Sequence, residues 1–433
     1  MHTETHRIDG HDVHEHVLTV PLDHTGATPG TIEVFAREYV RDGGRERPRL
    51  AWFQGGPGNR ANRPESVGGW LDRALTEFRV VLIDQRGTGR STPATRQTLA
   101  GVGDSAGGAA AEAQADYLAH FRADSIVADA EALRETLGET QWSVLGQSFG
   151  GFISTAYLSR APKSLREVFI TAGLPALTGP ADDVYRRTFA QTQRRNAEFA
   201  ARYPADVVAL HDVAAHLRTH EVHLPTGERL TPERFLQVGI KLGVSTGFEA
   251  LHFLLEDPFL TVGGEKRLNE RLLAEAGAAL SFAGNPLYAV LHETIYAQGA
   301  ASDGATAWAA QRVRDSLPQF DPSAAEPLLT GEHIFPFQFD QDPALRPLRD
   351  AAHLLAQRAD FPALYNPEAL AHNEVPVAAA VYHDDMFVPR ESSLATAAAI
   401  RGLRPWITND YQHDGIRADG ARILDRLITL ARR

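Results

Sequence analysis

A serine lies at the centre of a glycine-flanked pattern in the middle of the chain. The pattern is GxSxG, formed by Gly146, Gln147, Ser148, Phe149 and Gly150. It falls between a predicted strand and a predicted helix, the context in which GxSxG exposes a serine hydroxyl at a sharp turn. Larger side chains at positions 146 and 150 would clash in so tight a crossing. The pattern therefore predicts nucleophilic catalysis by Ser148.

A serine nucleophile needs a base, and the base needs an acid. An imidazole must take the proton of the hydroxyl, and a carboxylate must hold that imidazole. In chains with this turn the acid follows the serine and the histidine follows the acid. His413, in the loop NDYQHDG, is the only histidine after residue 385 and is the predicted base. The segment VPVAAAVYH ends at Asp384 and Asp385, of which one is the predicted acid and the other a turn-capping residue.

A second glycine-rich loop is placed to stabilise a negatively charged oxygen. Gly55, Gly56 and Gly58 follow the apolar segment LAWF, where hydrolases with the GxSxG turn carry one N–H group of an oxyanion hole. The other N–H group belongs to the residue after the nucleophile, which is Phe149 here. Glycine lets the backbone approach a substrate carbonyl closely. We therefore predict that the N–H groups of Gly55 and Phe149 form the oxyanion hole.

Alternating strands and helices must hold these loops. Strand patterns run over residues 31–40, 49–53, 78–84 and 142–146, and a helical pattern runs over 124–137. The apolar run FRVVLID is typical of a strand that is buried on both faces of a parallel sheet. This order of elements predicts an α/β fold with a mostly parallel sheet covered by helices.

The character of the chain changes between the two parts of this pattern. From 177 to 372 the segments are helical, rich in Ala, Arg and Glu, and show no buried strand pattern. The strand pattern returns at Val375, and a last helix covers 418–430. We therefore predict a first core segment over 1–176, a large helical cap insertion over 177–372 and a second core segment over 373–433.

Composition excludes several classes of protein. The 433 residues are 43% hydrophobic and 23% charged, as in an ordinary globular protein. The formal net charge of −12 argues against nucleic acid and against anionic membranes as partners. Because the chain has no cysteine, disulfides and thiolate metal sites are excluded. The N-terminal segment has no apolar run of signal-peptide length, so we expect a cytoplasmic protein.

Histidines cluster near the N-terminus and raise the question of a metal site. They are His2, His6, His11, His14, His16 and His24. None lies in a carboxylate–histidine spacing such as HExxH. We expect a solvated edge strand here, and we expect the predicted reaction to use neither a metal nor an organic cofactor.

With these residues identified, the chain resembles the prolyl aminopeptidases, also called proline iminopeptidases, and more closely their longer form. The motifs that carry the resemblance are VPLDH at 20–24, IEVFARE at 32–38, GGPG at 55–58, DQRGTGRS at 84–91, GQSFGGF at 146–152, HETIY at 292–296, GEHIFP at 331–336, DDMFVP at 384–389 and QHDG at 412–415. The family implies an α/β-hydrolase fold with a helical cap. Many members have HGGPG where this chain has Gln54, which leaves the backbone role of Gly55 unchanged.

The resemblance also implies an activity and further site residues. Members of the family cleave an N-terminal proline from peptides, so short peptides with N-terminal proline are the implied partners. Their acid stands four residues before a proline, which selects Asp385 over Asp384 because of Pro389. Acidic side chains of the cap hold the free α-amine, and by motif position these are Glu293 and Glu332. A buried secondary ammonium group does need such opposite charge.

Other functions share parts of this pattern. An esterase or amidase of the same fold would use the same serine, acid and histidine, and only dependence on a free α-amine would separate it from a peptidase. A related aminopeptidase could release other N-terminal residues, or di- and tripeptides. A hydrolase-like binding protein would keep the fold without the reaction. Epoxide hydrolases and dehalogenases are disfavoured because they need a carboxylate nucleophile where this chain has Ser148.

Overall fold

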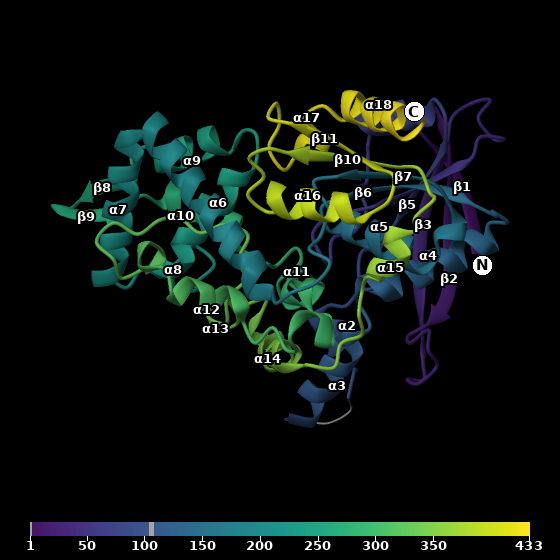
Figure 1. The fold of residues 1–433 in the computed structure, drawn as a ribbon. Coiled ribbons are helices and arrows are strands. Elements are labelled where there is room, and N and C mark those ends of the chain that lie inside the picture. The colour runs from purple at the N-terminus through teal and green to yellow at the C-terminus, as the bar shows by residue number, and fades with distance from the viewer. Residues whose placement is uncertain (1, 104–107) are drawn as a thin grey trace.

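A nine-stranded sheet runs through the computed structural model, which describes residues 2–103 and 108–433 (Figure 1). The strand order is β1-β2-β3-β5-β4-β6-β7-β10-β11. The antiparallel edge consists of β1 (His2–Ile8), β2 (His11–Pro21) and β3 (Thr31–Val40). The parallel strands are β4 (Arg49–Phe53), β5 (Arg79–Ile83), β6 (Trp142–Gln147), β7 (Leu165–Thr171), β10 (Val377–Tyr382) and β11 (Leu403–Thr408). The mostly parallel sheet predicted from the sequence is confirmed.

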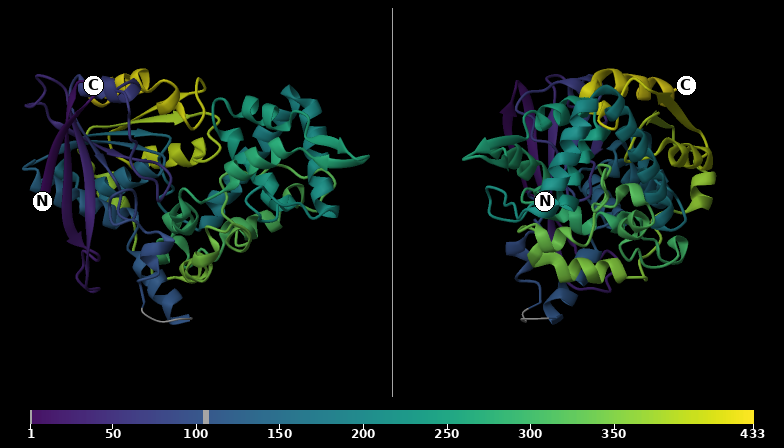
Figure 2. Two further views of the ribbon diagram at one scale, coloured as in Figure 1. Left: turned by 180° about the vertical axis from the view of Figure 1, so that it is seen from behind. Right: turned by 90° about the vertical axis from the view of Figure 1, so that its left-hand side faces the viewer.

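Helices cover both faces of this sheet (Figures 1 and 2). The helices of this part of the chain are α1 (Gly69–Leu75), α2 (Arg96–Leu99), α3 (Gly108–Ala119), α4 (Ala123–Thr136), α5 (Phe149–Arg160), η1 (Pro162–Ser164), α16 (Arg390–Ala399), α17 (Gly415–Ala418) and α18 (Gly420–Ala431). On β4, Leu50 and Trp52 share an apolar cluster with α1 and α18, whereas Ala51 and Phe53 share one with α4 and α5. Successive side chains of a strand point to opposite faces, so burial on both sides requires an unbroken apolar run.

The chain between β7 and β10 is mainly helical. Its elements are α6 (Ala181–Arg202), α7 (Pro204–Thr219), α8 (Pro232–Phe235), η2 (Leu236–Gly243), α9 (Gly247–Leu255), β8 (Phe259–Val262), β9 (Glu265–Leu268), α10 (Glu270–Leu280), α11 (Pro286–Leu291), η3 (Glu293–Tyr296), η4 (Gly299–Ser302), α12 (Ala309–Asp315), η5 (Pro318–Phe320), α13 (Gln338–Gln341), η6 (Arg346–Leu348), α14 (Arg349–Gln357) and α15 (Pro367–Ala371). The hairpin β8–β9 is exposed, which is why no buried strand pattern marks it in the sequence. We call this helical part the cap; the boundaries 177 and 372 stay a prediction.

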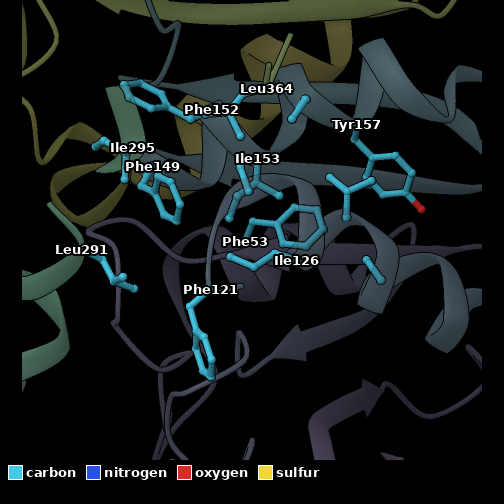
Figure 3. Packing of buried hydrophobic residues seen from close by; sticks show 14 of the residues in the cluster. Phe53, Phe121, Ile126, Phe149, Phe152, Ile153, Tyr157, Leu291, Ile295 and Leu364 are labelled. Atoms are coloured by element: carbon cyan, nitrogen blue, oxygen red, sulfur yellow. The ribbon is translucent and has the colours of Figure 1, made fainter. Parts of the chain in front are cut away.

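Apolar side chains join the cap to the sheet near the GxSxG turn. Figure 3 shows Leu291, Ile295 and Leu364, which come from the cap, in the same packed cluster as Phe149 and Phe152 of α5. The cluster is buried throughout, and burying side chains of this kind typically contributes about 1.5–3 kcal/mol each. The base of the cap is therefore fixed next to the start of α5.

The N-terminal strands correct one expectation from the sequence. The side chains of β1 are almost all exposed, as expected, but His16 on β2 is 4% exposed and its Nε2 atom lies 3.1 Å from Oε2 of Glu38. The expectation of a solvated edge is therefore wrong for His16, because β3 places a carboxylate beside it. Among the described residues no group of three or more His, Asp or Glu has a geometry that could hold a metal ion. In the same part of the chain, no helix combines the length and apolar character needed to cross a membrane.

Candidate active site

The turn between β6 and α5 has the strained geometry that the GxSxG pattern predicts. Ser148 has φ 55° and ψ −122°, a conformation that side-chain-bearing residues rarely adopt. A Cβ atom at Gly146 would lie 2.2 Å from the carbonyl oxygen of Gly150, and one at Gly150 would lie 1.9 Å from the carbonyl oxygen of Phe53. Glycine at these two positions is therefore required by contact with backbone that has no room to move.

Gly150→Ala is expected to destabilise the fold strongly. The added methyl group would overlap the carbonyl of Phe53, and forced overpacking of this kind costs about 3 kcal/mol. Urea unfolding should show a clearly lower midpoint for this variant. Gly68→Ala is the matched control, because a Cβ atom there would meet nothing within 4 Å. Equal midpoints for the two variants would contradict the tight crossing.

The predicted base and acid lie together at the ends of two neighbouring strands. His413 follows β11, and Asp385 follows β10. The Nδ1 atom of His413 is 2.9 Å from Oδ2 and 3.0 Å from Oδ1 of Asp385. Oδ1 also accepts hydrogen bonds from the N–H groups of Phe387 and Val388, each at 2.9 Å. Asp385 is thus held by its own loop, with both carboxylate oxygens within hydrogen-bond distance of the imidazole.

Asp384, the alternative acid, has a different partner. Its Oδ1 atom lies 2.8 Å from Nδ1 of His383, and both side chains are partly exposed. The structure therefore brings Asp385, and not Asp384, to His413, as the spacing to Pro389 implies.

The charge of Asp385 changes the basicity of His413. Burial by itself would lower the pKa of His413, but the negative charge and hydrogen bonds of Asp385 outweigh burial and raise that pKa above its usual value near 6.5. Glu332 adds to the rise. With the Nδ1 proton donated to Asp385, Nε2 is the free acceptor, and it lies 3.5 Å from the amide nitrogen of Gln147. Nε2 is therefore the atom of His413 able to take a proton.

The cap also touches the loop that carries His413. The backbone N–H of His413 donates to the carbonyl of Gly243 in η2, at 3.2 Å, and the Ser245 backbone N–H donates to the next residue, Asp414, at 2.9 Å. The Phe387 ring packs edge-on against the imidazole, with 4.8 Å between the two ring centroids. The cap contacts hold the loop that carries His413, and the Phe387 ring limits the space around the imidazole.

The glycine loop after β4 lies directly against the serine. A Cβ atom at Gly55 would be 2.2 Å from the Gln147 side-chain oxygen and 2.7 Å from Cβ of Ser148. The Asn59 side chain donates to the carbonyl of Gly55 at 2.9 Å and fixes the loop. Phe149 is the first residue of α5, and N–H groups in the first turn of a helix have no intrahelical acceptor. The two predicted oxyanion groups thus flank Ser148.

Polar side chains of the segment after β5, namely Asp84, Gln85 and Arg86, hold the backbone near this loop. Asp84 accepts from the backbone N–H groups of Ala61 and Arg90 at 3.1 and 2.9 Å. The Gln85 side chain donates to the carbonyl of Gln54 at 2.8 Å, and Arg86 is paired with Asp129. These side chains organise backbone and are not part of the cavity lining.

A cavity of about 510 Å³ opens above the serine between the sheet and the cap. Gly55, Ser148 and His413 line it from the sheet side, and Tyr288 and Glu332 line it from the cap side. The Tyr288 hydroxyl donates a hydrogen bond to Oε1 of Glu332. A half-buried carboxylate therefore faces the same space as the serine and histidine.

The other predicted amine ligand, Glu293, lies elsewhere. It is 4% exposed, does not belong to the cavity lining, and its Oε1 atom accepts the Ala310 N–H at 3.0 Å. Burial raises the pKa of its carboxyl, against the lowering effect of hydrogen bonds such as that from Ala310. Burial, followed by the charge of Glu293, raises the pKa of Tyr185 well above its usual value. Glu332 thus lines the cavity that contains Ser148, whereas Glu293 does not.

Comparison with known proteins gives this site a family. A family model described as alpha/beta hydrolase fold matches residues 48–260. A proline iminopeptidase of Aeromonas sobria is 48% identical over 430 residues, which are 98% of this chain and 98% of that protein. The chain belongs to the proline iminopeptidase family. A second proline iminopeptidase, from Aspergillus aculeatus, is 35% identical over 426 residues, or 95% of this chain and 92% of that protein.

The match to other members of the family is shorter. A proline iminopeptidase of Xylella fastidiosa is 33% identical over 118 residues, which cover 27% of this chain and 30% of that protein. The resemblance to the long form and the α/β-hydrolase fold predicted from the sequence are confirmed. The roles predicted for individual site residues stay predictions.

Two cavity residues of this family member carry no signal in the sequence. Tyr288 is one of several tyrosines in the cap, and only the fold brings it to Glu332. Gln147 occupies a variable position of GxSxG, and its contact with His413 joins residues 266 positions apart. Their presence in the site depends on how the cap and the last loop pack.

Proposed function

We propose that this chain is a serine exopeptidase that removes N-terminal proline from peptides through an acyl-enzyme on Ser148. The observation that carries the proposal is the shared cavity, in which Ser148 and His413 face the carboxylate of Glu332. Full-length likeness to proteins named proline iminopeptidase supports it. The cavity offers a nucleophile and base for the scissile carbonyl and a negative charge for a free amine.

The first half of the reaction forms an ester. Nε2 of His413 takes the proton of the Ser148 hydroxyl as the oxygen attacks the carbonyl carbon of the N-terminal proline. The tetrahedral oxyanion accepts hydrogen bonds from the N–H groups of Phe149 and Gly55, while Asp385 stabilises the imidazolium. The imidazolium then protonates the leaving amine. The C–N bond breaks, the shortened peptide departs, and prolyl-Ser148 ester remains.

The second half restores the enzyme. His413 removes a proton from water, and the resulting oxygen nucleophile attacks the ester carbonyl. Collapse of the second tetrahedral intermediate breaks the C–O bond, returns the proton to Ser148 and releases free proline. The same oxyanion groups serve both steps because the carbonyl oxygen occupies the same place.

Recognition of the amine would fall to Glu332. The nitrogen of an unblocked N-terminal proline is a secondary ammonium group, and a carboxylate binds it by charge-assisted hydrogen bonds. An N-acetylated proline has neither the charge nor the N–H groups. It would leave the carboxylate facing the substrate unpaired, which costs free energy.

Substrate comparison tests the proposal directly. Hydrolysis of proline β-naphthylamide should exceed that of the N-acetylated form and of the alanine and leucine β-naphthylamides. p-Nitrophenyl acetate, which lacks an amine, measures the reaction without amine recognition. Preference for acetylated proline or for the simple ester would replace the proposal by an esterase or amidase function. A preference for alanine or leucine would indicate an aminopeptidase of other specificity.

Two carboxylate variants separate the candidate amine ligands. Glu332→Gln removes a charged partner of the substrate, and such hydrogen bonds contribute about 1.5–3 kcal/mol, so KM for proline β-naphthylamide should rise roughly 10- to 150-fold. Glu293→Gln keeps the oxygen that accepts from Ala310 and should change KM less than about threefold. Steady-state kinetics on both variants decides which carboxylate binds the substrate amine. An equally large rise for Glu293→Gln would make Glu293 a direct amine ligand, as the motif position implies.

A further inference from the structure

A chain of hydrogen bonds joins the glycine loop to the cap across the cavity. Asn59 donates through its side chain to the carbonyl of Gly55 at 2.9 Å. The side-chain oxygen of Asn59 accepts in turn from the side chain of Asn285, the N-cap residue of α11. Asn285 closes the helix start by accepting the backbone N–H of Tyr288 at 3.2 Å. The start of α11 is therefore tied to the loop that carries Gly55.

Tyr288 continues this connection to Glu332. Its ring packs against the same loop, because a Cβ atom at Gly56 would lie 3.2 Å from ring atoms of Tyr288. Its hydroxyl donates to Oε1 of Glu332. Burial, and then the charge of Glu332, raises the pKa of Tyr288 well above its usual value, so the hydroxyl keeps its proton and acts as the donor. One carboxylate oxygen of Glu332 is thus occupied, and the other has no hydrogen-bond partner among the residues that the structure describes.

We propose that Tyr288 is a positioning residue for substrate recognition, which holds the carboxylate of Glu332 at a fixed place relative to the glycine loop of the oxyanion hole. The inference rests on the proposed function, because it assigns the amine of the substrate to Glu332. In any substrate with a free N-terminal residue, one carbon atom separates the amine from the scissile carbonyl. A carboxylate and an oxyanion hole held at one spacing therefore select an α-amine and disfavour amines farther along a chain.

The packing of Tyr288 makes this role specific to its hydroxyl. The ring contributes to the wall between cap and loop, and phenylalanine would fill the same space. Only the hydrogen bond to Glu332 is lost in Tyr288→Phe. The carboxylate would then be free to rotate, and its contact with a substrate ammonium would lose orientation.

The test is a double-mutant cycle on the full chain with Tyr288→Phe, Glu332→Gln and the double variant, assayed on proline β-naphthylamide and p-nitrophenyl acetate. Tyr288→Phe should raise KM for the prolyl substrate roughly tenfold. The ratio of prolyl to ester hydrolysis should fall. Because Tyr288 acts through Glu332, the double variant should match Glu332→Gln alone.

A matched control removes a hydroxyl that makes no hydrogen bond within the described part of the chain. The Tyr365 hydroxyl is buried without a hydrogen-bond partner among the described residues, so Tyr365→Phe should leave KM unchanged. Thermal unfolding verifies that all variants are folded. An unchanged KM in Tyr288→Phe, or additive effects in the double variant, would overturn the inference about Tyr288 but not the proposed function. A wild-type enzyme that cleaves the ester but not the prolyl substrate would overturn the proposed function and this inference with it.

Discussion

Ser148→Ala is expected to lower kcat for proline β-naphthylamide on the order of a millionfold, because no other group at the turn can form the acyl-enzyme. The variant should also lose covalent labelling by a fluorophosphonate, which reacts with activated serine hydroxyls. Alanine has the same backbone preference as serine at φ 55°, so the strained turn and the fold should persist. Thermal unfolding should verify that the variant is folded. A loss of activity in folded variant protein then reports the loss of the nucleophile.

Ser159→Ala provides the control for this prediction. Ser159 lies on α5, the helix that begins directly after the nucleophile. Its hydroxyl donates to the carbonyl of Thr155 and accepts from the backbone N–H of Asn366, each at 3.1 Å, and it does not line the cavity. The kcat of Ser159→Ala should stay within about threefold of the wild-type value, since substitutions away from the core and the active site have small effects. Retained labelling or activity in folded Ser148→Ala would contradict the catalytic assignment and favour a different nucleophile.

The centre of the site could be predicted from the sequence because its requirements are local. A GxSxG turn needs glycine where backbone atoms approach within 2.2 Å of a would-be Cβ atom, and that need is visible in the sequence itself. The position of His413 follows from chain order, since only one histidine remains after the acid. The strand at 49–53 could also be predicted, because burial of both of its faces requires the apolar run at residues 50–53.

The amine side of the cavity could not be predicted in the same way. Glu293 and Glu332 are both candidates in the sequence, because each is an acidic residue in a motif. Their surroundings differ only after the cap has packed: Glu293 accepts a backbone N–H of α12, and Glu332 meets the Tyr288 hydroxyl at the cavity. Contacts between segments that are distant in the sequence decide which carboxylate lines the cavity, and no local pattern records them.

The same reason explains the misjudged histidine of the N-terminal strands. Asp12, His14 and His16 lie on one face of β2, and polar side chains of this kind near a sheet edge are usually solvated. His16 is nevertheless buried because Glu38 on β3 is its partner, in the register that aligns His16 with Ala36. Glu38 is in turn paired with Arg49 of β4, so a buried polar network replaces water at this edge. Pairing across strands, and not the pattern within one strand, sets the environment.

Asp385→Asn is expected to reduce kcat about 10⁴-fold at neutral pH by changing the tautomer of His413. The N–H groups of Phe387 and Val388 hold the Oδ1 position, so the asparagine oxygen should stay there and its NH₂ group should replace Oδ2. That NH₂ group would donate to Nδ1 of His413, which now lies 2.9 Å from Oδ2. The imidazole proton would then be on Nε2, and the atom that must accept the Ser148 proton would be blocked.

The pH dependence gives an independent signature of the same interaction. His413 must be neutral to act as a base, and Asp385 raises its pKa above the usual 6.5, so the acid limb of kcat/KM in wild type should have its midpoint above that pH. Removing the negative charge should lower the pKa of His413 and move the residual acid limb to lower pH. Asp384→Asn is the matched control: it alters the neighbouring carboxylate, which contacts His383, and should leave both rate and midpoint near wild type. If Asp384→Asn showed the large loss instead, Asp384 would be the catalytic acid and the hydrogen bonds of Asp385 would serve only its loop.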